Sequence, residues 1–93
     1  MKSENFIAKY NNTSLGAQSF LACHQDASRY SFGVSLNIDY EGGGTWYPRQ
    51  NKLIKLPTGY AVLHPSPTHR HGARPVIEGT RYILISFCNQ VDN

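Results

Sequence analysis

The sequence predicts an all-β fold, a jelly roll (double-stranded β-helix) of about eight short strands with few or no helices. Two observations predict this fold: apolar and polar residues alternate with a period of two, and turn residues separate the short apolar segments. Short strands at such regular spacing are typical of jelly rolls and small barrels. The chain of 93 residues amounts to one domain. We expect a single domain over residues 1–93, with the barrel at about residues 6–88.

The alternation is clearest between Tyr30 and Tyr40. Every even-numbered position in this segment is apolar or aromatic, and every odd-numbered position is polar or glycine. Alternate side chains of a strand point to the same face, so we expect the even-numbered stripe to lie in the core. Two shorter strands are expected before this segment, at residues 6–10 and 20–26.

Five further strands are expected after a run of three glycines at 42–44, namely 45–47, 52–56, 60–63, 69–73 and 81–88. Turn residues at 57–59, 65–67 and 78–79 separate them. The segment 81–88 is apolar on both faces, as expected for a central strand. The glycine run lacks the lysine and the following helix of a phosphate-binding loop, so it predicts a bulge or tight turn beside a site.

The composition excludes several classes of partner. The chain has nine Lys and Arg residues and six Asp and Glu residues, which give a net charge of +3. The basic residues form no cluster, so no nucleic-acid partner is expected. No apolar stretch approaches the roughly 20 residues of a transmembrane helix, and no secretory signal is recognisable. We therefore expect a soluble protein and leave its compartment and oligomeric state open.

Cys23 and Cys88 are too few for a disulfide scaffold, so one bridge and two free thiols are both compatible with the sequence.

The side chains that carry chemistry are a histidine and a carboxylate two residues apart, His24 and Asp26. On a strand these two would share a face, and His71 offers a second imidazole from another strand. Two histidines and one carboxylate form the facial triad of non-haem Fe(II) oxygenases, which leaves coordination positions open. Cys23 would point to the opposite face and is not expected to be a ligand.

Arg81 lies in an otherwise apolar strand, where a charge is costly unless it is paired. An oxygenase of this kind needs a co-substrate such as 2-oxoglutarate, whose far carboxylate suits the fork of a guanidinium. His69 shares a face with His71 and could compete as the third ligand, but the ten-residue step to Arg81 favours His71. His64, just before a proline, is interpreted as a turn or packing histidine.

Three aromatic residues near these elements, Tyr30, Trp46 and Tyr47, are interpreted as core or rim residues. Their type and position do not mark them as substrate contacts.

The ordered elements Cys23–Ser28, Asp39–Thr45, His71–Val76 and Gly79–Tyr82 resemble the catalytic domain of 2-oxoglutarate/Fe(II)-dependent dioxygenases. Within that superfamily the pattern is most similar to the lysyl hydroxylase (procollagen-lysine dioxygenase) branch, next to the prolyl hydroxylases. The resemblance extends over about residues 6–87. It implies hydroxylation of a lysyl or prolyl side chain in a polypeptide.

The resemblance also implies site residues and cofactors. His24, Asp26 and His71 would bind Fe(II) as the catalytic triad, while Arg81 and Tyr10 would bind 2-oxoglutarate. O2 is the second co-substrate, and ascorbate is the implied reductant. A carboxylate at Asp26, where a halogenating enzyme would carry Gly or Ala, favours hydroxylation.

Two alternatives stay open. One is a cupin-like jelly-roll binding module whose metal is structural or absent. The other is an inactive or incomplete dioxygenase fragment, because the helical segments that usually precede the barrel are not found in the sequence.

Overall fold

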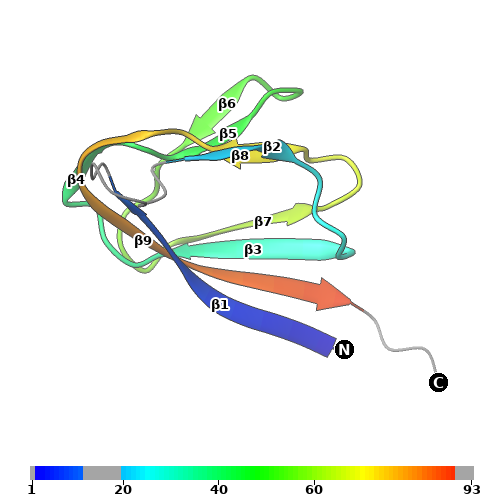
Figure 1. The fold of residues 1–93 in the computed structure, drawn as a ribbon. Helices are drawn as coiled ribbons and strands as arrows, with labels where there is room; N and C mark the ends of the chain where they lie inside the picture. The colour runs from blue at the N-terminus through cyan, green and yellow to red at the C-terminus, as the bar shows by residue number, and fades with distance from the viewer. Residues whose placement is uncertain (1, 12–19, 90–93) are drawn as a thin grey trace.

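A computed structural model describes residues 2–11 and 20–89, and its regular elements are nine strands in two antiparallel sheets that face each other (Figure 1). The larger sheet has the order β1 (Lys2–Asn11), β9 (Val76–Asn89), β3 (Tyr30–Ser35) and β7 (Ala61–Pro65), with β4 (Tyr40–Gly42) also paired to β9. The smaller sheet has the order β2 (Leu21–His24), β8 (His71–Ala73), β5 (Thr45–Tyr47) and β6 (Lys52–Ile54). The prediction of an all-β jelly-roll-like fold is confirmed.

Among the described residues no helix has the length and apolar character needed to span a bilayer. Residues 12–19, which belong to the expected barrel range, lie outside the described part of the chain.

The expected strand at 30–40 is two strands, β3 and β4, separated by residues 36–39. The two segments pair with different parts of β9: β3 with its second half and β4 with its beginning.

The prediction of a turn at 78–79 is also wrong, because β9 runs through these residues. Gly79 has a φ of 83°, a conformation that glycine adopts at little steric cost, so the strand continues through this position. As expected, β9 is a central strand, since β1 and β3 flank it.

The prediction that the even-numbered stripe of residues 30–40 forms the core is confirmed for Tyr40 but wrong for β3 and the residues after it. Ser31 and Gly33 lie on the inner face of β3, whereas Tyr30 is 47% exposed and Ile38 is 54% exposed. The inner face carries a polar group because the hydroxyl of Ser31 donates a hydrogen bond to Asp26 in the site between the sheets. It carries a glycine because a Cβ at Gly33 would lie only 2.9 Å from Ile83 Cδ1.

The buried apolar cluster is small. Tyr10, Tyr40, Val76 and Ile83 form it, and Ala8, Ala73 and Ile85 pack against them. Both cysteines are free thiols in the structure, so no bridge joins Cys23 to Cys88. Buried polar side chains lie beside further apolar residues in the rest of the interior, and they form the site described next.

Candidate metal centre

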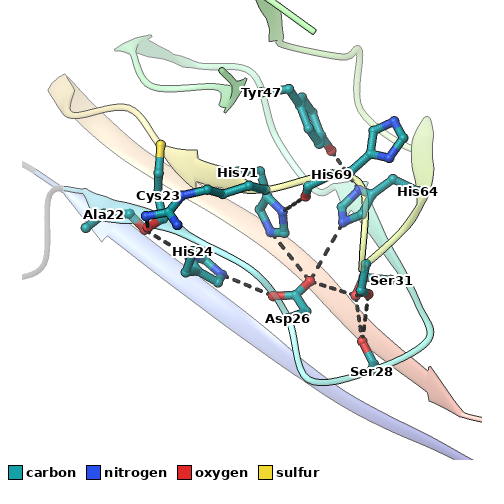
Figure 2. A network of polar contacts seen from close by, with 12 residues as sticks. Ala22, Cys23, His24, Asp26, Ser28, Ser31, Tyr47, His64, His69 and His71 are labelled. Atoms are coloured by element: carbon teal, nitrogen blue, oxygen red, sulfur yellow. Dashed lines mark hydrogen bonds and ion pairs between the residues drawn. The ribbon is translucent and has the colours of Figure 1, made fainter. Parts of the chain in front are cut away.

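Two of the predicted ligands are a cross-strand pair. His24 at the end of β2 lies directly opposite His71 at the start of β8, and their ring centroids are 4.7 Å apart. Directly opposite residues of an antiparallel pair have Cβ atoms about 5 Å apart, so the ladder itself brings the two imidazoles together. Both rings point toward the larger sheet (Figure 2).

Asp26 lies beyond the end of β2, on the connection to β3, rather than on the strand as expected. Its carboxylate nevertheless lies beside both imidazoles. Oδ1 is 3.1 Å from His24 Nε2, and Oδ2 is 3.5 Å from His71 Nε2. One possible ligand atom from each of His24, Asp26 and His71 lies within 4.8 Å of the others.

Backbone carbonyls orient both imidazoles. His24 Nδ1 is 2.9 Å from the carbonyl oxygen of Ala22, and His71 Nδ1 is 2.8 Å from that of His69. A carbonyl can only accept, so in each neutral ring Nδ1 carries the proton and donates it. The lone pair is then on Nε2, the nitrogen that faces Asp26. Such an outer hydrogen bond is the usual device that fixes the tautomer of a metal-binding histidine.

The protonation states of the centre follow from its surroundings. Burial alone would raise the pKa of Asp26, but contacts with His64 and Ser31 and the neighbouring His71 and His24 lower it to about 2. Burial lowers the pKa of His71, although the His69 carbonyl and Asp26 act in the opposite direction. A carboxylate and a neutral imidazole are the forms that bind a metal ion.

Two imidazole nitrogens and one carboxylate oxygen suit a first-row divalent metal such as Fe(II). The Nε2 lone pairs of His24 and His71 both point at the Asp26 carboxylate, and they repel it unless a cation or a proton lies between them. The three residues therefore fit a bound divalent cation.

Arg81 lies in the same pocket as the three ligands, and it is only 6% exposed. Its Nη1 donates to the carbonyl of Gly44 (3.1 Å) and its Nη2 to Thr45 Oγ1 (2.9 Å). Within residues 2–11 and 20–89 no carboxylate lies within ion-pair distance of this guanidinium. A buried cation held only by neutral groups suits an anionic ligand.

Tyr10 is directly opposite Arg81 in the β1–β9 ladder, and its ring centroid is 5.7 Å from the guanidinium carbon. Burial raises the pKa of Tyr10, and the charge of Arg81 offsets only part of the rise. The phenol is therefore neutral and can donate a hydrogen bond into the pocket. The structure thus brings all five predicted site residues to one pocket.

The other two histidines lie outside the predicted triad, His69 as the sequence favoured and His64 in a place that the turn interpretation did not predict. His69 precedes β8 and does not join the cluster of possible ligands; it contributes its carbonyl oxygen to His71. His64 is not a turn residue: it lies within β7 and is 6% exposed, with Nε2 3.7 Å from Asp26 Oδ2. Tyr47, interpreted as core or rim, is 2.9 Å from His64 Nδ1 through its hydroxyl.

Sequence reasoning also missed Ser31, whose hydroxyl donates to Asp26 Oδ2 at 2.7 Å. Ser31 and His64 are directly opposite each other in the β3–β7 ladder. The available signal was the parity of the strand: Ser31 and Gly33 are the small residues of an alternating segment, and small residues leave room on a face that carries a site.

Comparison with known proteins gives the relatives of this chain. No family model matches it. The human multifunctional procollagen lysine hydroxylase and glycosyltransferase LH3 is 41% identical over 88 residues, which are 89% of this chain and 12% of that protein. Procollagen-lysine,2-oxoglutarate 5-dioxygenase 1 is 39% identical over 87 residues in Bos taurus and 40% identical over 87 residues in Gallus gallus, in each case 88% of this chain and 12% of the relative.

The chain therefore spans about one eighth of the length of the relatives it matches. Identity near 40% over almost nine tenths of the chain confirms the resemblance inferred from the motifs. The chain is related to the lysyl hydroxylase branch of the 2-oxoglutarate/Fe(II)-dependent dioxygenases.

Proposed function

We propose that this chain forms the catalytic centre of an Fe(II)- and 2-oxoglutarate-dependent hydroxylase that acts on lysyl side chains of a polypeptide. One observation carries the proposal. The clustered His24, Asp26 and His71 share a pocket with a buried arginine that has no carboxylate partner among the described residues. The relatives named as procollagen lysine hydroxylases and 2-oxoglutarate dioxygenases support the same reaction class.

In this proposal each residue has a separate task. His24 Nε2, one oxygen of Asp26 and His71 Nε2 hold the metal. The guanidinium of Arg81 pairs with the far carboxylate of 2-oxoglutarate, and Tyr10 donates a hydrogen bond to the same end of the co-substrate. Gly44 and Thr45 hold the guanidinium in place before the co-substrate arrives.

Iron, when bound, would activate O2, and each of the two oxygen atoms would enter a different product. One oxygen atom converts 2-oxoglutarate to succinate and CO2, and the other enters the C–H bond of the substrate as a hydroxyl group. Ascorbate would keep the metal in its reduced state between turnovers. The protein supplies ligand geometry, the anion anchor and a pocket from which bulk water is largely excluded.

The outer side of the centre is open where the substrate has to approach. The side chain of His24 is 35% exposed, against 13% for His71 and 3% for Asp26. A side chain of a bound polypeptide would therefore enter from the His24 side, while the co-substrate occupies the deeper end near Arg81. We also propose that the two sheets form one domain, because the centre needs residues from both.

The test is a turnover assay that measures succinate and hydroxylated peptide together. The purified protein is incubated with Fe(II), 2-oxoglutarate, ascorbate and a lysyl peptide. Matched peptides carry norleucine or proline at the lysyl position. We expect equal amounts of succinate and hydroxylysine with the lysyl peptide and no hydroxylated product with norleucine. Hydroxylation of the prolyl peptide alone would reject the lysyl assignment, and no product from any peptide under these conditions would contradict the proposal.

A further inference from the structure

The larger sheet contributes a buried histidine to the metal centre that the triad does not include. His64 lies on the inner face of β7, and its ring centroid is 4.6 Å from that of His71. Its Nε2 is buried and has no hydrogen-bond partner among the described residues. Asp26 Oδ2 lies 3.7 Å from it, beyond hydrogen-bonding distance.

Tyr47 determines which nitrogen of a neutral His64 carries the proton. The Tyr47 hydroxyl lies 2.9 Å from His64 Nδ1. A phenolic hydroxyl is protonated at neutral pH, so Tyr47 can donate this hydrogen bond. If Tyr47 donates to Nδ1, the proton of the imidazole is on Nε2 and points at the carboxylate. The opposite tautomer would direct a lone pair at a carboxylate in a buried site, which is unfavourable.

Asp26 Oδ2 therefore lies between two donors from the larger sheet. Ser31 donates at 2.7 Å, and His64 Nε2 approaches from the strand directly opposite Ser31. Figure 2 shows both side chains converging on this oxygen, while Oδ1 faces His24. Oδ2 also lies 3.5 Å from His71 Nε2, and Oδ1 lies 3.1 Å from His24 Nε2, so the donors from the larger sheet approach the carboxylate from the side opposite the two ligand imidazoles.

We propose that His64 is a positioning residue, part of a Tyr47–His64–Asp26 relay that holds the carboxylate in the orientation in which one oxygen binds the metal. The inference rests on the proposed function, because it assigns a task toward the metal of that centre. Outer hydrogen bonds to ligating side chains commonly change metal affinity by 10- to 100-fold. The relay is built from β5, β7 and the β2–β3 connection, so it also ties the smaller sheet to the larger one.

Three substitutions at His64 separate positioning from packing. Gln places an amide nitrogen where His has Nε2, so His64→Gln keeps the donor to Asp26. Asn places its polar group where His has Nδ1, so His64→Asn keeps the contact with Tyr47 and loses the one with Asp26. His64→Leu keeps volume and loses both. The readouts are the Kd for Co(II), followed by its visible absorption, and the unfolding midpoint of the metal-free protein.

We expect His64→Asn and His64→Leu to weaken Co(II) binding 10- to 100-fold and His64→Gln by less than threefold. Tyr47→Phe keeps the ring and removes only the hydroxyl, so its effect should be intermediate even if a His64 variant folds poorly. In the double variant with His64→Leu, the Tyr47 change should add nothing, because both act through one relay.

Equal Co(II) affinity in wild type, His64→Asn and His64→Leu would overturn the inference, as would a loss in His64→Gln as large as that in His64→Asn. His24→Ala serves as the control that removes a ligand. If the wild type binds Co(II) and 2-oxoglutarate while the His64 variants match it, only the relay is rejected. If the wild type binds no metal, the proposed function falls as well.

Discussion

At the scale of single residues, Asp26 connects every part of the centre. Its carboxylate faces His24 and His71 from one sheet and accepts a hydrogen bond from Ser31 of the other. It is 8% exposed, and such burial is favourable for a charged group only if partners surround it. Replacing Asp26 therefore removes a ligand and leaves the surrounding donors without an acceptor.

Asp26→Ala is expected to abolish 2-oxoglutarate-dependent turnover and to weaken Fe(II) binding by at least 100-fold, because only two imidazoles remain as ligands. Asp39→Ala is the matched control, since Asp39 is exposed and its carboxylate contacts Asn37 outside the pocket. Succinate release and metal titration measure both effects. Turnover that persists in Asp26→Ala would reject Asp26 as a ligand.

The pKa of Asp26 predicts a specific response to acid. Because its folded-state pKa is about 2, below the ordinary 3.8, its ionised form stabilises the folded state at all pH values above about 4. This contribution, on the order of 2 kcal/mol, is lost as pH falls from about 4 toward 2. The measurement is urea unfolding of metal-free wild type and Asp26→Asn across this range. Their difference in unfolding free energy should shrink with falling pH; a constant difference would contradict the assignment.

At the scale of elements, the sequence predicted most strands but not which face of each is buried. Alternation in residues 30–40 correctly indicated β3, but it missed the break at 36–39. It also indicated the wrong inner face of β3, because an interior that contains a polar site reverses the usual rule. His24, Asp26 and His71 were recognisable from their order along the chain. His64 was not, because only the β3–β7 register shows that it lies opposite Ser31 and beside Asp26.

The contact between β2 and β8 determines where His24 and His71 meet, and Gly72 allows it. An added Cβ at Gly72 would lie 2.7 Å from Leu21 O and 2.9 Å from Cys23 N, both in the backbone of β2. Gly72→Ala should therefore push β2 away from β8, cost about 1–3 kcal/mol of stability and weaken metal binding.

Gly33→Ala is the matched control for this prediction, because its new methyl group would meet the flexible end of Ile83 rather than backbone. It should cost less stability and leave the Kd for Co(II) unchanged. Equal effects of the two substitutions on metal affinity would show that the spacing of β2 and β8 does not control the centre.

At the scale of the whole molecule, the two sheets enclose a small apolar cluster and the pocket that holds the polar site. Tyr10, Tyr40, Val76 and Ile83 are the members of that cluster. A domain of this size has limited apolar area to bury, so bound ligands should contribute strongly to its stability. We expect Co(II) to raise the melting temperature, and 2-oxoglutarate to raise it by several further degrees only when Co(II) is present.

This thermal experiment also separates the proposed enzyme from a cupin-like binding module. A module with a structural metal would be stabilised by Co(II) alone, and one without a metal by neither ligand. Equal stabilisation by 2-oxoglutarate with and without Co(II) would contradict a shared centre.

The most direct test of the account is the calorimetric titration of Co(II)-loaded wild type and Arg81→Gln with 2-oxoglutarate and 2-oxopentanoate. The two ligands share the keto-acid end, and only 2-oxoglutarate has the far carboxylate that Arg81 would bind. We predict that wild type binds 2-oxoglutarate at least tenfold more tightly than 2-oxopentanoate, and that Arg81→Gln binds both equally weakly. An Arg81→Gln variant that keeps the wild-type preference, or a wild type without one, would contradict the account.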